Sequence, residues 1–349
     1  NIPQDKKDDL LKAMVNPLAG DPQAKYEDAV AAGASNSYNQ QQADQAVNNA
    51  KTQQQSVQPP AQGGGGVQTS DDAMRNGEAG LKVFGMFMDA WKNRPSDCIG
   101  NYPALDMNKD ITTRYQEQYG INFQKFLDDA GKFGTGDTTV GTTHTDVANQ
   151  LNSLYKDWTG SAANASSQHY NNDIDPKIKE LNDALHGAST LIPSTVQTVY
   201  TQCTNKADDV LKLYRDQVGQ ATPYMAGLVV KMAASDGNDD DDDKLRSQIQ
   251  EISMWVDGAT GSDITSRVND DSCSLNQDNI QYCIDQCKKW VRDSFNTDFY
   301  GDQGTPGLYM QFKKICDDTK TQVDSAWQNL TDTMKKYQCD FPQSTAPVT

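Results

Sequence analysis

The chain has 349 residues, a formal net charge of −17, a hydrophobic fraction of 36% and a mean hydropathy of −0.76. This length allows one long domain or two compact ones, and the low hydrophobic fraction predicts that part of the chain is polar tail or loop. Because an acidic surface repels phosphate, nucleic acid and anionic membranes are excluded as expected partners, and no apolar run reaches the roughly 18 residues of a transmembrane segment.

Residues 1–75 form a polar N-terminal segment rich in Gln, Asn and Gly. The stretch 26–55 is compatible with a polar helix that lacks a sustained apolar stripe. The run Pro-Pro-Ala-Gln-Gly-Gly-Gly-Gly at 59–66 predicts a flexible linker. We therefore expect a segment and linker of low order before the first packed domain.

Residues 76–234 are predicted to form a helical domain, because apolar residues recur there at helical spacing. Leu81, Phe84, Met88 and Trp91 make the first stripe, and 111–133 is also predicted to be helical. A helical hairpin follows, and we expect Pro193 to interrupt its second helix. The apolar residues of its first helix are Val147, Leu151, Leu154, Tyr155 and Trp158; those of its second are Tyr170, Ile174, Ile178, Leu181, Leu185 and Ala188.

The turn of this hairpin is predicted at Trp158-Thr159-Gly160. Glycine permits backbone conformations that residues with a Cβ resist, and tryptophan can cover a helix junction with a large apolar surface. Trp158 and Gly160 are therefore the candidate interaction residues at the tip.

Beyond the hairpin, residues 235–243 are an acidic loop, 244–340 are predicted as an antiparallel pair of helices, and 341–349 as a tail. No segment shows the alternation typical of strands. The patterns together predict an all-α fold, an elongated helical bundle of antiparallel hairpins with a polar N-terminal region of low order.

Seven cysteines favour an oxidising compartment, because the three histidines show no zinc-site spacing beside them. If the C-terminal helices turn near residue 302, Cys287 faces Cys316, and Cys273 falls near Cys339. We predict the first pair as a disulfide and the second as a further candidate. Reduced thiols in the core remain the alternative.

One group of residues has the spacing of a calcium-binding loop, and no cofactor is expected. Asp106, Asn108, Asp110 and Glu117 have the spacing of EF-hand ligands, but Ile111 stands where the loop requires glycine. The ordinary interpretation is a loop in which Asp110 caps the next helix. The chain shows no Walker A loop, nucleophile elbow or His-Glu-x-x-His motif, so an enzyme is not predicted.

The hairpin resembles the Trp-x-Gly superfamily of type VII (ESX) secretion substrates, which includes the PPE and Esp proteins. The resemblance covers about residues 145–215 and rests on Leu151, Leu154, Trp158, Gly160, Ala162 and Ala163. It implies that the hairpin tip is a recognition surface. The family's export signal, Tyr-x-x-x-Asp/Glu, matches only residues 102–106, which precede the hairpin and contain Pro103, so the signal is not carried over to this chain.

The leading hypothesis is a non-enzymatic protein, secreted or at the cell surface, that acts by partner binding or self-assembly. A protein partner or a second copy of the chain is expected, and the resemblance implies the secretion machinery as a further partner. The alternative is a coiled-coil surface or adhesive protein, stapled by disulfides and exported through a general signal-peptide route.

Overall fold

The computed structural model describes residues 10–12, 14, 22–237, 242–269, 275–302 and 304–337. The fold in these ranges is all-α, as predicted: they contain many helices and isolated bridges but no β-strand. None of the helices in the described ranges has both the length and the apolar character needed to cross a membrane.

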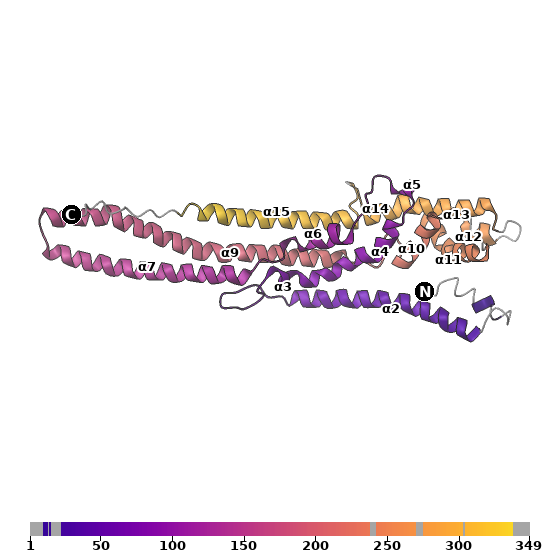
Figure 1. The fold of residues 1–349 in the computed structure, drawn as a ribbon, viewed down its shortest axis with the longest axis horizontal. Helices are drawn as coiled ribbons and strands as arrows, with labels where there is room; N and C mark the ends of the chain where they lie inside the picture. Colours follow the sequence, from indigo (N-terminus) through magenta and orange to yellow (C-terminus); the bar gives the residue numbers. More distant parts are fainter. Residues whose placement is uncertain are drawn as a thin grey trace. The chain divides into compact units, whose positions relative to one another are not determined.

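The helices up to the hairpin turn include the long α2 and α7 (Figure 1). In chain order they are α2 (Pro22–Gln55), α3 (Ser70–Met74), the 3-10 helix η2 (Arg75–Leu81), α4 (Lys82–Lys92), α5 (Ser96–Ile99), the π-helix η3 (Met107–Thr112), α6 (Thr113–Tyr115), the 3-10 helix η4 (Gln116–Gln118) and α7 (Phe123–Asp157).

The helices after the turn include the long α9 and α15. They are α8 (Ser161–His169), the π-helix η5 (Tyr170–Ile174), α9 (Asp175–Leu213), α10 (Pro223–Ala233), α11 (Asp242–Thr260), α12 (Ile264–Asn269), α13 (Gln277–Trp290), the π-helix η6 (Val291–Phe295), α14 (Asn296–Phe299) and α15 (Leu308–Met334).

The chain folds into two compact units, and each unit is assembled from segments far apart in the sequence. Unit 1 comprises 1–55, 76–117 and 206–317, whereas unit 2 comprises 56–75, 118–205 and 318–349. The two long helices α9 and α15 each contribute residues to both units.

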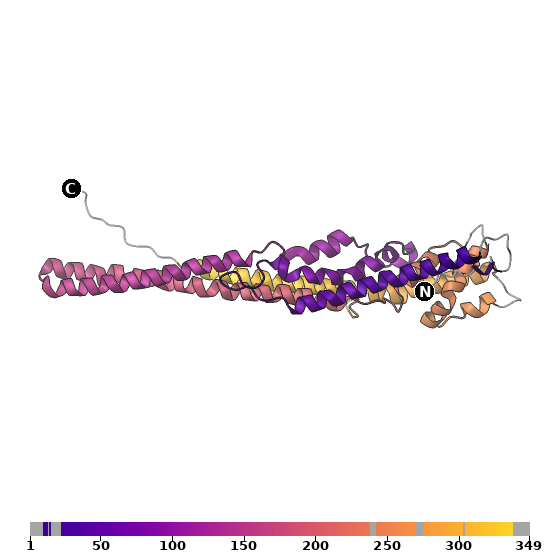
Figure 2. The same cartoon turned by 90° about the horizontal axis from the view of Figure 1, so that it is seen from below.

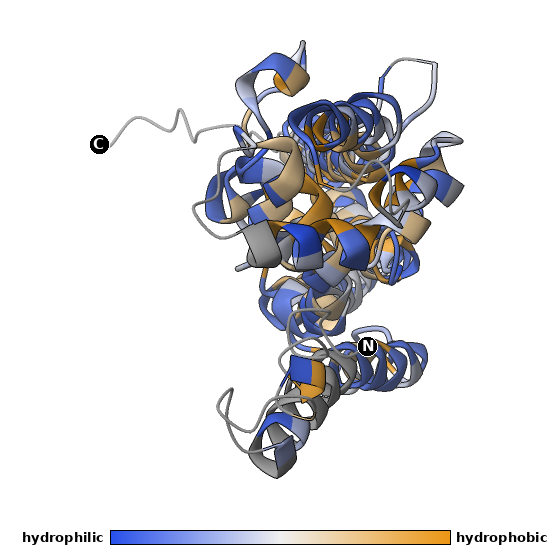
Figure 3. Cartoon of the chain, turned by 90° about the vertical axis from the view of Figure 1, so that its right-hand side faces the viewer, coloured by the Kyte–Doolittle hydropathy of each residue, from blue (hydrophilic) through white to orange (hydrophobic). Residues whose placement is uncertain are grey.

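Unit 1 is built around apolar faces of short helices. α10 packs against α4, α11 and α13, and α13 also packs against α11 and α12. The apolar faces of these helices turn inward, as Figure 3 shows in orange. The buried face of α13 carries Ile280, Cys283, Ile284 and Cys287.

Aromatic rings fill the core of unit 1 where α4 meets η6 and α14. Trp91 lies 4.9 Å from Phe299 and 6.0 Å from Phe295 between ring centroids. The side chain of Trp290 is also buried, and its indole N–H donates to the carbonyl of Gly219 at 2.8 Å. Buried aromatic side chains of this size contribute heavily to core stability.

The buried Arg94, which follows α4 in the sequence, packs against this aromatic core. The Arg94 guanidinium donates to Asn296 Oδ1 at 2.5 Å and to the Trp91 carbonyl at 2.8 Å, and it lies 3.2 Å above the Trp91 ring centroid. Burial lowers the pKa of Arg94 to about 10.

The polar helix α2 belongs to unit 1 through a small number of contacts. Val47 and Ala50 are buried against Leu211 of α9. The Tyr214 hydroxyl donates to Asp44 Oδ1 at 2.8 Å, so a polar contact reinforces this small apolar patch. The N-terminal region was expected to be of low order, with 26–55 compatible with a polar helix. The structure has a helix there, from Pro22 to Gln55.

The predicted disulfide between Cys287 and Cys316 is not present in the structure, where both are buried free thiols. Cys287 hydrogen-bonds with Cys283 one turn away on α13, and this bond together with burial raises the pKa of Cys287. Cys316 instead lies beside Lys206, and burial raises its pKa to about 11. Each thiol thus has a different set of neighbours. Cys273 and Cys339, the second candidate pair, lie outside the described residues.

Unit 2 contains α7, residues 175–205 of α9 and residues 318–334 of α15. Its core is formed by Phe123, Leu127 and Ala130 of α7 together with apolar residues of the other two helices; those are Ala188, Ile192, Val196, Val199, Val323 and Leu330. The Phe126 and Trp327 rings lie 4.7 Å apart, which places α15 against α7.

The prediction that Pro193 interrupts the hairpin's second helix is wrong, because α9 continues through it. Proline removes one backbone donor, which weakens a helix locally. The hydroxyls of Ser194 and Thr195 both donate to the Leu191 carbonyl, at 2.8 and 3.0 Å. Val196 and Val199 are buried on the next turns, so tertiary packing offsets the lost hydrogen bond.

Two glycines on neighbouring segments of unit 1 provide a test of its close packing. A Cβ at Gly80 would lie 2.7 Å from the Val210 carbonyl carbon and 2.9 Å from the Leu211 nitrogen, whereas a Cβ at Gly85 would meet nothing within 4 Å. We expect Gly80→Ala to lower the free energy of unfolding by about 1–3 kcal/mol, because the backbone must move. Gly85→Ala should raise it by up to about 1 kcal/mol. Urea unfolding followed by circular dichroism measures both; equal effects would contradict close packing at Gly80.

Candidate interaction site on the Trp-x-Gly hairpin

The turn between α7 and α8 has the predicted position and depends on glycine geometry. The backbone N–H of Trp158 donates to the Leu154 carbonyl at 2.8 Å and closes the last turn of α7. Gly160 precedes α8 with φ 109° and ψ −178°, a region that essentially only glycine populates. A Cβ there would meet no atom within 4 Å, so backbone conformation rather than space requires the glycine.

Trp158 lies against its own helix rather than over the junction. Its ring stacks on Tyr155 at a centroid distance of 6.2 Å, and the Tyr155 hydroxyl bonds the Ser166 hydroxyl of α8 at 3.0 Å. The Trp158 side chain is 40% exposed, and Leu154 is 49% exposed. The tip thus presents two large apolar side chains to solvent. Ala163 fills the junction instead and is buried.

Side-chain bonds fix the register of the two arms. His144 Nε2 lies 2.6 Å from Asp175 Oδ1, and His186 Nδ1 lies 3.0 Å from Asp137 Oδ2. A bond to Lys179 and then the bond to His144 lower the pKa of Asp175. These contacts join α7 to the antiparallel α9, which lies beside it in both views (Figures 1 and 2).

An apolar groove of about 250 Å³ runs between the arms. Val140, Val147, Ile178 and Leu181 line it together with Thr139, Thr143 and His144. Val147 is 37% exposed on this surface. The groove and the tip are therefore two candidate surfaces of the hairpin for binding an apolar protein segment.

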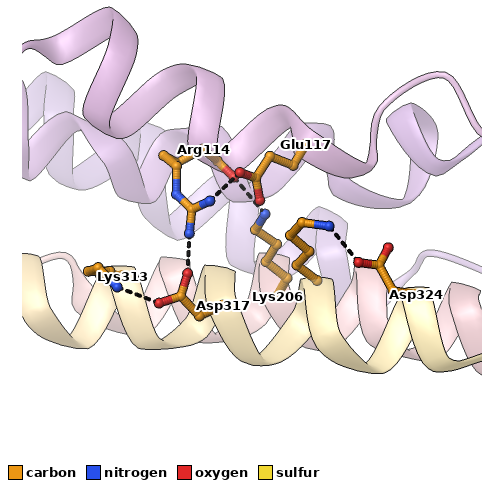
Figure 4. Close-up of polar contacts among 7 residues, drawn as sticks. Arg114, Glu117, Lys206, Lys313, Asp317 and Asp324 are labelled. Atoms are coloured by element: carbon orange, nitrogen blue, oxygen red, sulfur yellow. Dashed lines mark hydrogen bonds and ion pairs between the residues drawn. The ribbon is translucent and has the colours of Figure 1, made fainter.

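Among the residues with calcium-ligand spacing, Asp106, Asp110 and Glu117 form hydrogen bonds or ion pairs with other groups of the protein. The Asp106 side chain accepts from Lys109 N at 2.7 Å, and Asp106 N donates to Asp110 Oδ2 at 2.8 Å, so these two cap η3. Glu117 pairs with Arg114, which also bonds Asp317 (Figure 4). Within the described ranges, no group of three or more His, Cys, Asp or Glu side chains is suited to a metal ion.

The segment that matches the export signal lies far from the hairpin in the sequence and is not helical. Residues 102–106 lie between α5 and η3 and are not part of a helix. The Tyr102 ring packs 5.7 Å from the Tyr300 centroid, and the Arg94 guanidinium reaches the Tyr102 carbonyl at 3.5 Å. This tyrosine therefore serves the packing of unit 1.

The sequence analysis placed Trp158 and Gly160 at the hairpin turn but did not predict the His–Asp contacts or the groove. The histidines were dismissed as metal ligands because their spacing is irregular. Their partners lie 31 and 49 residues away, so only the antiparallel register of the arms could have revealed them.

Comparison with known families identifies the hairpin region. Residues 118–202 match the model of the family described as proteins of 100 residues with WXG. This match confirms the resemblance to Trp-x-Gly substrates of type VII secretion, over a segment that includes α7, α8 and most of α9. Proteins of this family form homodimers or heterodimers. Comparisons with curated proteins and with solved structures gave no match.

The conformation of the turn gives a direct prediction. Gly160→Ala should weaken the protection of the tip amides against hydrogen exchange by roughly 1–3 kcal/mol, because alanine is strained at this φ and ψ. Gly141→Ala is the matched control on α7, where a Cβ would meet Asn182 at an ordinary 3.6 Å. Unchanged exchange at residues 154–166 in Gly160→Ala would contradict the observed backbone conformation.

The ion pairs of Asp317 with Arg114 and Lys313 predict that the stability of the fold depends on pH. Bonds to Lys313 and then Arg114 lower the pKa of Asp317. Its ionised form therefore stabilises the fold above the unfolded-state pKa of about 3.9, and this contribution disappears as pH falls through the lower folded-state pKa.

We expect the difference in unfolding free energy between the wild type and Asp317→Asn to be constant above about pH 5 and to shrink below about pH 4. Urea titrations across this range measure the difference. Asp324→Asn is the control, because Asp324 bonds Lys320 on the same helix surface (Figure 4). A difference that grows on acidification would refute the assignment.

Proposed function

We propose that the chain is an exported, non-enzymatic protein that binds a protein partner through its Trp-x-Gly hairpin. The family match over residues 118–202 supports this proposal, because this family consists of non-enzymatic secreted substrates that pair with other proteins. Its site of action would be the cell surface or the medium.

The observation that carries the proposal is the exposed apolar tip. Trp158 and Leu154 keep 40% and 49% of their surface in solvent although the hairpin itself is well formed. Large apolar side chains left exposed together are typical of a surface that another protein covers. Recognition by the export machinery, or by a partner that carries the export signal, would use this tip.

One further observation concerns the alternative of a surface protein stapled by disulfides. The free thiols of Cys287 and Cys316 weigh against a surface protein stapled by this disulfide.

Replacement of the tip tryptophan tests the proposal. Trp158→Ala should abolish export, or pairing with the partner, because it removes the main apolar contact of the tip. The measurement is the amount of chain in the culture medium against the amount in cells, with circular dichroism showing that the variant folds. Met254→Ala is the control, since Met254 is 78% exposed on α11, which belongs to unit 1. Normal export of a folded Trp158→Ala protein would refute the proposal.

A further inference from the structure

A cleft of about 630 Å³ lies in unit 1, between α11 and the turn that precedes α10. A volume of this size is within the usual range for a small-molecule site. The Trp-x-Gly turn belongs to unit 2 and contributes nothing to this cleft. The lining residues are Gln220 of the turn and Gln250, Glu251, Met254, Trp255, Gly258 and Ala259 of α11.

Gln220 has a backbone conformation that costs energy. Its φ is 65°, and it is the only residue other than glycine with a positive φ in the described part of the chain. With Gly219, at φ 57°, it forms the centre of a tight turn that hydrogen bonds of 2.9 and 3.0 Å between Val218 and Ala221 close. Turns with two positive φ values favour glycine, which would fit here without strain. Strain of this kind concentrates at functional sites, and here it places an amide side chain at the cleft.

Trp290 holds this turn and the aromatic wall of the cleft together. Its indole N–H donates to the Gly219 carbonyl at 2.8 Å, and its ring meets the Trp255 ring edge to face at a centroid distance of 5.4 Å. The Gly219 N–H also donates to Asp298 Oδ2 at 3.0 Å. The backbone of Gln220 and the ring of Trp255 are therefore held in place before a ligand arrives, which lowers the entropy cost of binding.

The polar groups of the cleft are available to a ligand. The Tyr224 hydroxyl donates to Glu251 Oε1 at 2.5 Å and so orients this carboxylate. The side-chain amides of Gln220 and Gln250 have no hydrogen-bond partner among the described residues. No Lys, Arg or His lines the cleft. The cleft thus offers amide donors, amide acceptors and one carboxylate around an aromatic ring, without a cation.

We propose that this cleft binds a neutral sugar. A sugar ring has an apolar C–H face, which packs on an aromatic ring, and hydroxyl groups, which need both donors and acceptors. Trp255 provides the aromatic surface. The amides of Gln220 and Gln250 both donate and accept, and the Glu251 carboxylate accepts. An anionic ligand is disfavoured, because the lining carries a negative charge and no positive one. This site is separate from the hairpin and adds a second binding function.

Isothermal titration calorimetry of the full chain tests the proposal. The probes are neutral trisaccharides built from glucose, mannose, galactose or N-acetylglucosamine. At least one of them should bind with a Kd of about 1 mM or lower. Trigalacturonic acid should bind more weakly than the best neutral sugar, because its carboxylates meet Glu251.

Gln220→Gly is the most informative variant. Its affinity for the best trisaccharide should fall by about three- to tenfold, because the amide that bonds the sugar is lost. Its midpoint of urea unfolding should not fall below that of the wild type, because glycine adopts a positive φ without strain. Weaker binding by an equally stable protein distinguishes a role in binding from a folding defect.

A matched pair on α11 provides the control. Gln250→Ala should also weaken binding of the trisaccharide by about three- to tenfold. Gln248→Ala should bind it as the wild type does, because Gln248 lies on the same helix but lines a different cavity.

Four outcomes would overturn the inference. They are no binding of any neutral trisaccharide up to about 10 mM, tighter binding of trigalacturonic acid, equal affinity in Gln220→Gly and the wild type, and binding of an uncharged peptide of alternating Ser and Val instead of any sugar. Export is assigned to the hairpin in unit 2, so none of these results alters what is expected of Trp158→Ala or of its control Met254→Ala.

Discussion

The core of unit 2 depends on a third helix, because two helices side by side cannot remove a wide apolar stripe from water. α7 and α9 are long and paired by side-chain bonds, yet within unit 2 their buried residues lie near the start of α7 and from Ala188 onward on α9, the part that Trp327 and Tyr337 contact. Backbone hydrogen bonds keep such a hairpin helical, but most helical stability in proteins comes from tertiary packing. The local stability of unit 2 should therefore follow the extent of α15.

The two units use their large aromatic residues in opposite ways. In unit 1, Trp91 and Trp290 are almost completely buried among Phe295 and its neighbours. In unit 2, Trp158 rests on Tyr155 with much of its ring in solvent. The first arrangement stabilises a fold, whereas the second leaves a large aromatic side chain exposed at the hairpin tip.

Sequence patterns were sufficient for the elements and for the turn, but not for long-range packing. Helical spacing correctly placed the apolar stripe of α4, and Trp158-Thr159-Gly160 correctly marked the position of the turn. The disulfide prediction failed because it required α13 to face α15, whereas α13 packs against three other helices. The prediction at Pro193 was wrong for a related reason. Proline disfavours the interior of a helix, but the burial of Val196 and Val199 on the next turns keeps α9 continuous.

The buried thiols make the described fold independent of redox conditions. Cys98, Cys283, Cys287 and Cys316 are free and shielded from solvent, and burial raises the pKa of Cys98 and Cys316. Because the thiolate is the reactive form, these residues are poor targets for oxidants or alkylating reagents while the chain is folded. The packing around these four thiols therefore does not depend on a bond that a reductant could break. Covalent labelling of these four sulfur atoms would in turn record how often each part of the chain opens.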